Sequence, residues 1–247
     1  MTRCLLLLVG LVAIAVPQAM AAPGRPISAQ PMADAAAHGL PEDARVGRIR
    51  DGTRDDDGRP AEATGMAIAK AASGGDRPGP SRPRGTVGVT APCAVSDEPD
   101  RVSEVPDLAG MIACGWVVVA TGDPGLGIPG AHACLNPDAA GHAALDSVAA
   151  AGALVEAGAG WRDALRGHCQ GGHASLAVAA RARAGLPGHA LVAVAAASSP
   201  TYLAADFAAA EVPGGDHAGN PDAVEREVIA WLEDRSVGGL APNDWLG

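Results

Sequence analysis

The stretch Gly167-His168-Cys169-Gln170-Gly171 constrains the fold more than any other part of this 247-residue chain. It puts a nucleophilic side chain two positions from a glycine on either side, between a strand expected at Ala164–His168 and a helix expected at Gly171–Ala184. A nucleophile at such a turn has a strained backbone, and the glycines leave room for it. The helix that begins there stabilises negative charge, which favours a thiolate. The motif predicts a reactive Cys169; a glycine-rich turn around a buried, inert cysteine is the alternative.

Apolar runs alternate with helix-like segments through the second half of the chain. Further buried strands are expected at Gly115–Ala120 and Ala190–Ala197. Helices are expected at Val105–Ala113, Asp138–Glu156 and, as an amphipathic terminal helix, Asp222–Arg235. This alternation predicts the α/β class, with a mostly parallel sheet covered by helices. Sites in such sheets form at the carboxyl ends of the strands, and the loops after residues 120, 168 and 197 are expected there.

Residues 1–21 have the pattern of a signal peptide. Arg3 supplies the positive start, and the apolar run Leu5–Val16 is too short to span a bilayer comfortably. Ala19-Met20-Ala21 places small residues where a signal peptidase cuts. We therefore expect a secreted protein, extracellular or periplasmic, with no stable membrane anchor after cleavage. An uncleaved anchor is the alternative.

The rest of the N-terminal half shows weaker patterns. Residues 22–45 are expected to form an N-terminal arm, and residues 46–247 the folded domain. The turn cluster Asp55–Pro60 predicts a hairpin over residues 46–70. Residues 72–85 are rich in Gly, Pro and Arg, which predicts a loop rather than a strand.

Charge and composition exclude several classes of partner. The net charge of −10 argues against nucleic acid, because binding phosphates requires a basic surface, and against anionic membranes. Aromatic residues make up 2% of the chain, so the core must be built from small side chains. No two histidines have the i, i+4 spacing of a helical metal site, and Gly122–Gly127 lacks a dinucleotide fingerprint. We expect neither a metal nor a cofactor.

Several stretches together point to one family. In chain order they are Gly115–Ala120, Pro124–His132, Leu145–Val148, Gly167–Ala174, Gly215–His217 and Ala230–Arg235. They resemble the secretory lipase family of bacteria and fungi, within the α/β-hydrolase superfamily. The resemblance covers residues 40–240 with gaps and is most specific over residues 115–176. It implies an α/β-hydrolase fold and a triad in the order nucleophile, acid, histidine.

Carried onto this chain, the triad falls on three residues. Cys169 is the nucleophile, His217 on a late loop is the base, and Asp206 is the acid. An ordinary exposed loop histidine is the alternative for His217. Only about twenty residues separate Ser198 from His217, where the family has a lid and the strand that bears the acid. The resemblance therefore implies that this segment is missing here.

The oxyanion hole and the elbow depart from the family pattern. The resemblance implies that the backbone N–H groups of Gln170 and of Gly85 or Thr86 hold the oxyanion. The family carries serine at the elbow and His-Gly-Thr in the oxyanion loop, where this chain has Cys169 and Arg84-Gly85-Thr86. Dienelactone hydrolases resemble this arrangement, with a cysteine elbow on the same fold.

The function expected from these observations is that of a secreted carboxylic ester hydrolase. It would act on a small-molecule ester or lipid, with a role in lipid catabolism. A catalytically inactive relic and a protein that binds an apolar ligand on the same fold are the alternatives. The pairing of Cys93, Cys114 and Cys134 is left open by cysteine counting.

Overall fold

The computed structural model describes residues 21–32, 40–71, 75–97, 105, 107–154, 157–182 and 190–199. Several of the sequence expectations lie outside the described residues: the expected signal peptide up to residue 20, Asp206, His217, the expected terminal helix and the segment expected to lack a lid.

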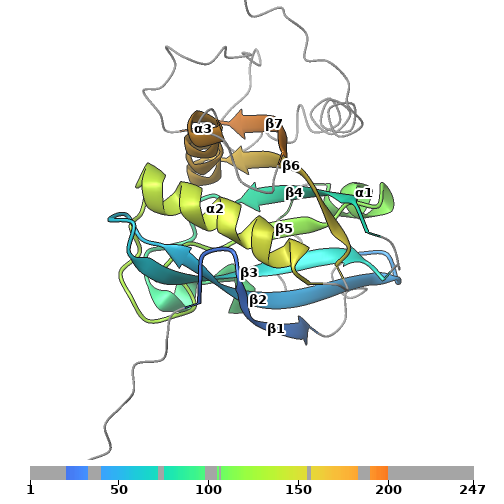
Figure 1. Ribbon diagram of the computed structural model, residues 1–247, viewed down its shortest axis with the longest axis horizontal. Coiled ribbons are helices and arrows are strands. Elements are labelled where there is room, and N and C mark those ends of the chain that lie inside the picture. The colour runs from blue at the N-terminus through green and yellow to red at the C-terminus, as the bar shows by residue number, and fades with distance from the viewer. Residues whose placement is uncertain are drawn as a thin grey trace, which may run out of the picture.

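One sheet organises the described residues. Its strands are β1 (Pro26–Met32), β2 (Ala44–Arg54), β3 (Pro60–Lys70), β4 (Arg77–Pro83), β5 (Val118–Thr121), β6 (Ala159–His168) and β7 (Ala190–Ala197). Their order across the sheet is β1-β2-β3-β5-β4-β6-β7 (Figure 1). β1, β2, β3 and β5 pair antiparallel in that order, whereas β5, β4, β6 and β7 are parallel. The carboxyl ends of the four parallel strands therefore share one edge.

Helices cover both faces of this sheet. The helices are α1 (Leu108–Ala113), α2 (Pro137–Gly152) and α3 (Gln170–Ala182), with short 3-10 helices at Ala91–Cys93 and Val95–Asp97. Figure 1 shows α2 and α3 on the same side of the sheet. Val118 packs in the core cluster that contains α1, whereas Val119 packs with Ala151 of α2. Successive side chains of β5 thus pack on opposite faces of the sheet, as the pleat of a strand requires.

The α/β class predicted from the sequence is confirmed. β7 matches its expected bounds, the hairpin forms as β2 and β3 around the turn at residues 55–59, and α2 and α3 begin within one residue of expectation. The start of α2 has a clear local cause: the Asn136 side chain accepts hydrogen bonds from the backbone N–H groups of Asp138 and Ala139 at 2.9 and 3.2 Å.

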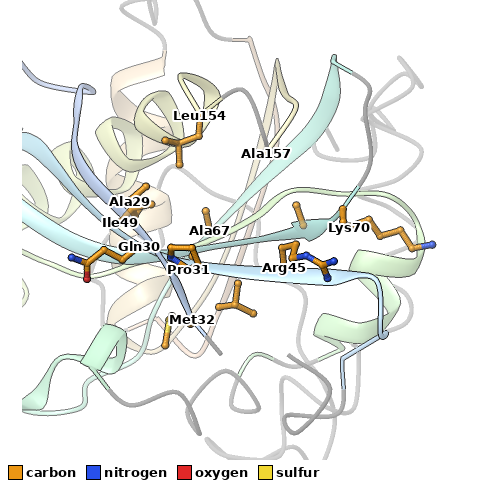
Figure 2. Close-up of a pocket in the computed structure, with 14 residues that line it drawn as sticks. Ala29, Gln30, Pro31, Met32, Arg45, Ile49, Ala67, Lys70, Leu154 and Ala157 are labelled. Atoms are coloured by element: carbon orange, nitrogen blue, oxygen red, sulfur yellow. The ribbon is translucent and has the colours of Figure 1, made fainter. Parts of the chain in front are cut away.

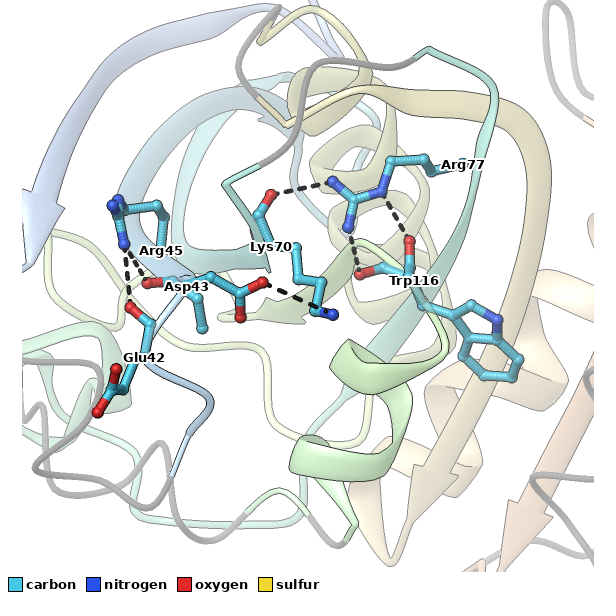
Figure 3. Close-up of polar contacts among 8 residues, drawn as sticks. Glu42, Asp43, Arg45, Lys70, Arg77 and Trp116 are labelled. Atoms are coloured by element: carbon cyan, nitrogen blue, oxygen red, sulfur yellow. Dashed lines mark hydrogen bonds and ion pairs between the residues drawn. The ribbon is translucent and has the colours of Figure 1, made fainter.

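The expectation of a loop over residues 72–85 is wrong for residues 77–83, which form β4 between β5 and β6. Three prolines in this segment, Pro78, Pro80 and Pro83, lack a backbone N–H, which makes it a poor strand by local criteria. Tertiary contacts override this. The Arg77 guanidinium donates to the carbonyl oxygens of Gly115 (2.7 Å), Lys70 (3.1 Å), Ala157 (3.2 Å) and Trp116 (3.3 Å), and fastens the start of β4 to its neighbours (Figure 3).

The segment expected to be an N-terminal arm also contains a strand. β1 pairs with β2 from Met32 opposite Val46 to Pro26 opposite Asp51, and is largely exposed. Its weak sequence signal fits its position, because an edge strand needs no continuous apolar face. Pro26 and Pro31 limit its ability to pair with a further strand, a common protection of sheet edges.

Small side chains fill much of the core, as the scarcity of aromatic residues predicts. The buried apolar residues include many alanines, among them Ala143, Ala144 and Ala150 of α2. Trp116 is the one buried aromatic residue of the described part. Within the described residues, no helix combines the length and hydropathy needed to cross a membrane.

Candidate active site

Cys169 occupies a sharp turn between β6 and α3. Its backbone φ is +54°, in the left-handed region that non-glycine residues seldom adopt. Holding such a conformation costs about 1–3 kcal/mol, which the surrounding structure must supply. The Cys169 N–H donates to the carbonyl oxygen of Ala197 at 3.0 Å, which anchors the turn to the end of β7. The turn joins strand to helix, the context that the motif requires.

The glycines beside the turn are required by close backbone contacts. A Cβ atom on Gly167 would lie 1.9 Å from the carbonyl oxygen of Gly171. A Cβ atom on Gly171 would lie 1.9 Å from the carbonyl oxygen of Pro83 at the end of β4. Both distances exclude any side chain. The predicted role of these glycines is confirmed.

The loop after β4 lies against the turn. A Cβ atom on Gly85 would be 3.7 Å from the Cys169 Cβ and 3.6 Å from the His168 carbonyl oxygen. The hydroxyl of Thr86 donates to Oε1 of Gln170 at 3.1 Å. The structure therefore brings together four of the residues expected at the site, namely Cys169, Gln170, Gly85 and Thr86. Asp206 and His217 lie outside the described residues.

The buried Gln170 side chain contacts two loops at this edge of the sheet. Its Oε1 accepts from Thr86 and also from the thiol of Cys134 at 3.5 Å. Its Nε2 donates to Oδ2 of Asp123, just after β5, at 2.9 Å. Nε2 of His132 lies 3.3 Å from the Gln170 Nε2 and 3.9 Å from the Asp123 carboxylate. The residue that follows Cys169 is thus held by side chains from the loops after β4 and β5.

Asp123 is a buried carboxyl group within this network. Burial raises its pKa, and His132, Arg84 and the hydrogen bond from Gln170 oppose that rise. The His132 side chain is 1% exposed, and its Nδ1 has no hydrogen-bond partner among the described residues. The loop after β5 therefore places a polar cluster beside the turn.

Sequence reasoning missed Asp123, His132 and Cys134 as members of this site. A usable signal was present, because the three residues follow a strand whose carboxyl end shares an edge with the Cys169 turn. Their convergence on the side chain of Gln170 depends on loop geometry, which periodicity does not encode.

A separate apolar groove, with a volume of about 750 Å³, lies elsewhere in the molecule (Figure 2). Its lining includes Pro31, Gly47, Ala67, Ala69, Leu154 and Ala157. Gly65 of β3 is opposite Thr121 at the end of β5, so the Ala69 end of β3 lies at the start of β5. The groove also includes Ile49 and lies on β1, β2 and β3, which β5 and β4 separate from the β6 strand that leads to Cys169.

Two basic side chains at the groove already have partners. Lys70 lies 3.6 Å from Asp43, and Arg45 donates to the carbonyl oxygens of Ala44 (2.9 Å) and Glu42 (3.5 Å) (Figure 3). The groove is predominantly apolar, and it contains none of the residues expected at the catalytic site.

The sheet order and the turn at Cys169 define an α/β-hydrolase fold, and comparisons with solved structures support this class. The esterase LipA of Xanthomonas oryzae, described as degrading the rice cell wall, matches one structure with a TM-score of 0.61 and 23% identity, over 72% of this chain and 51% of LipA. A second LipA structure matches with a TM-score of 0.62 and 21% identity, over 89% of this chain and 62% of LipA.

Lipase A of Candida antarctica in its closed state also matches, with a TM-score of 0.55 and 18% identity, over 72% of this chain and 43% of the lipase. The chain spans less than two thirds of the length of these proteins. No family model matches the sequence. No curated protein matches it either. At these identities the likeness concerns the fold.

Proposed function

We propose that this chain is a carboxylic ester hydrolase that acts through the thiol of Cys169. The observation that carries the proposal is the backbone of Cys169: a φ of +54° at a turn from strand to helix, with Gly85 packed against it. A strained conformation at such a turn is seldom kept without a functional reason. The fold shared with esterases and lipases supports the same chemistry.

In the proposed reaction the Cys169 sulfur attacks the carbonyl carbon of an ester. The backbone N–H of Gln170 and an N–H of the Gly85–Thr86 loop stabilise the negative oxygen of the tetrahedral intermediate. His217 takes the thiol proton and passes it to the departing alcohol, and Asp206 orients His217. A thioester on Cys169 remains, and water activated by His217 hydrolyses it to release the acid and regenerate the thiol.

The direct test uses an activated ester. The reduced full chain is expected to hydrolyse p-nitrophenyl acetate, and Cys169→Ala is expected to abolish this activity. Cys114→Ala is the matched control, because Cys114 is an exposed cysteine on the loop that follows α1. Equal turnover by the parent and Cys169→Ala would exclude Cys169 as the nucleophile.

We also propose that the chain is exported and that its substrate is a small-molecule ester or lipid. The pattern of residues 1–21 supports export. N-terminal sequencing of protein recovered from the medium should begin at Ala22. Recovery of the chain from the cytoplasm with residues 1–21 still attached would contradict this.

Binding of an apolar ligand is a second candidate function, favoured by the groove of about 750 Å³. Its volume is typical of small-molecule sites. A Cβ atom on Gly47 would meet its nearest neighbours at 3.8 Å, so Gly47→Leu fills the groove without a backbone clash. This variant should lose binding of decanoate, whereas Ala113→Leu, at an exposed position of α1, should retain it. Absence of decanoate binding by the parent would remove this candidate.

A further inference from the structure

Cys134 and Cys169 both lie next to Gln170, one through a side-chain contact and the other along the chain. Cys169 directly precedes Gln170, and the thiol of Cys134 donates to Oε1 of Gln170 at 3.5 Å. Cys134 comes from the loop between β5 and α2, whereas Cys169 follows β6, so the fold rather than the sequence brings them to one place. Both are half-buried, and neither is in a disulfide.

The surroundings of Cys134 agree with this proximity of the two thiols. Burial raises the pKa of the Cys134 thiol, and the charges of Asp123 and Cys169 raise it further. Cys169 stands immediately before the first residue of α3.

We propose that Cys134 and Cys169 are a redox-active pair that forms a reversible disulfide by exchange with a small disulfide. The Cys169 sulfur attacks one sulfur of the small disulfide, forms a mixed disulfide and releases one thiol. The Cys134 sulfur then attacks the sulfur of Cys169, and the second thiol leaves. The two cysteines lose two electrons and two protons, and the small disulfide gains both to become two thiols.

Cys134 lies in an irregular segment between β5 and α2. Gly130 has a φ of +143° and Leu135 a φ of +58°, so the segment bends sharply on both sides of Cys134. The Asn136 cap fixes its far end to α2. Bringing the two sulfur atoms to bonding distance breaks the hydrogen bond between Cys134 and Gln170, and the remainder of the Gln170 network stays available.

The consequence for hydrolysis rests on the proposed function. A disulfide at Cys169 occupies the nucleophile, so the oxidised chain is inactive toward esters and a dithiol reductant restores it. The disulfide itself requires no esterase activity. The two proposals can therefore fail separately.

The experiment uses the reduced full chain, incubated with glutathione disulfide, alkylated with iodoacetamide and digested for mass spectrometry. In the parent we expect a link between the peptides of Cys134 and Cys169, no bound glutathione, and loss of alkylation at both residues. Cys134→Ser keeps a hydroxyl donor for Gln170, and we expect it to accumulate glutathione on Cys169. Cys114→Ser, which alters an exposed cysteine, should behave like the parent.

Other outcomes would overturn the inference. Stable glutathione on Cys169 in the parent would show that Cys134 does not resolve it. A link from Cys169 to Cys93 or Cys114 would show that Cys134 is not the disulfide partner of Cys169. Continued alkylation of both Cys134 and Cys169 after oxidation would show that the pair does not react.

Discussion

The side-chain amide of Gln170 donates a hydrogen bond of 2.9 Å to the carboxylate of Asp123, and so ties the residue after the Cys169 turn to the end of β5. The other end of the same amide accepts from Thr86, which follows β4. Three neighbouring parallel strands therefore contribute to one polar network at their shared carboxyl edge. In the proposed function this network holds the two sides of the oxyanion hole in register.

Thr86 tests that network, because it acts through Gln170. Thr86→Val removes the hydroxyl donor and keeps the side-chain shape, so the loop at Gly85 loses its tie to the turn. We expect kcat for p-nitrophenyl acetate to fall about tenfold with little change in KM, less than the loss of a direct oxyanion donor. Thr86→Ser retains the hydroxyl and should restore kcat. Equal kcat values for Thr86→Val and the parent would show that the contact between Thr86 and Gln170 does not contribute to catalysis.

Gly171 tests the packing that forces the turn. A Cβ atom at this position would lie 1.9 Å from the Pro83 carbonyl oxygen, so β4 or α3 must move to admit alanine. We expect Gly171→Ala to lower the free energy of unfolding by about 3 kcal/mol or more. Gly152→Ala is the control at the end of α2, since no atom other than those of its chain neighbours and its own helix backbone lies within 4 Å of the place its Cβ would take. Denaturant unfolding measures both, and equal midpoints would contradict the close contact.

Asp51 predicts a dependence of stability on pH. Burial raises the pKa of Asp51 to about 8, and the nearby Asp146 carboxylate adds to the rise. The folded chain holds a proton that the unfolded chain, with a pKa of 3.8, releases. Between these two pKa values the folded state binds more protons, so Asp51 lowers stability as pH rises, by up to about 1.4 kcal/mol per pH unit.

Asp51→Asn removes this titration. We expect the variant to lose stability less steeply than the parent from about pH 5 to pH 7, as measured by urea unfolding. Asp56→Asn, in the exposed turn between β2 and β3, should leave the slope unchanged. A parent whose stability rises steadily with pH over this range, with Asp51→Asn following the same curve, would contradict the buried, protonated state of Asp51.

The elements predicted well are those whose local and tertiary preferences agree. The apolar run of β7 and the alanine-rich α2 need little help from their neighbours, and both were located from the sequence. β4 was missed because its prolines argue against a strand, while the contacts that hold it, such as those of Arg77, come from residues far along the chain. Local patterns carry no information about those contacts.

The residues of the candidate site were likewise predicted only in part. The turn at Cys169 was predictable, because a nucleophile flanked by glycines at that spacing is typical of one backbone geometry. The loop at Gly85 was placed through the family resemblance, and the structure brings it to Cys169. The Asp123–Gln170–Cys134 network was not predicted, since it depends on how two loops fold over the turn. The roles of His217 and Asp206 stay predictions.

Exchanging the nucleophile tests its partners. Serine depends on a base and an orienting acid at the moment of attack, because its hydroxyl ionises far above neutral pH, whereas a thiol needs less help. The segment expected to bear the acid is short, so we expect Cys169→Ser to be the poorer enzyme, by about a hundredfold or more in kcat/KM. Brisk turnover by Cys169→Ser would contradict a weak orientation of His217 by Asp206, and Asp206→Ala would then test whether Asp206 is the acid.

The central claim, that Cys169 is an ester-hydrolysing nucleophile, is tested most directly by capturing its acyl intermediate. The reduced chain is mixed with p-nitrophenyl acetate, quenched in acid within the first turnover and digested for mass spectrometry. We expect an acetyl group on the peptide that contains Cys169, formed as the first equivalent of nitrophenol appears and lost as turnover proceeds. An acetyl group on another residue, or release of nitrophenol with Cys169 unmodified throughout, would contradict the claim.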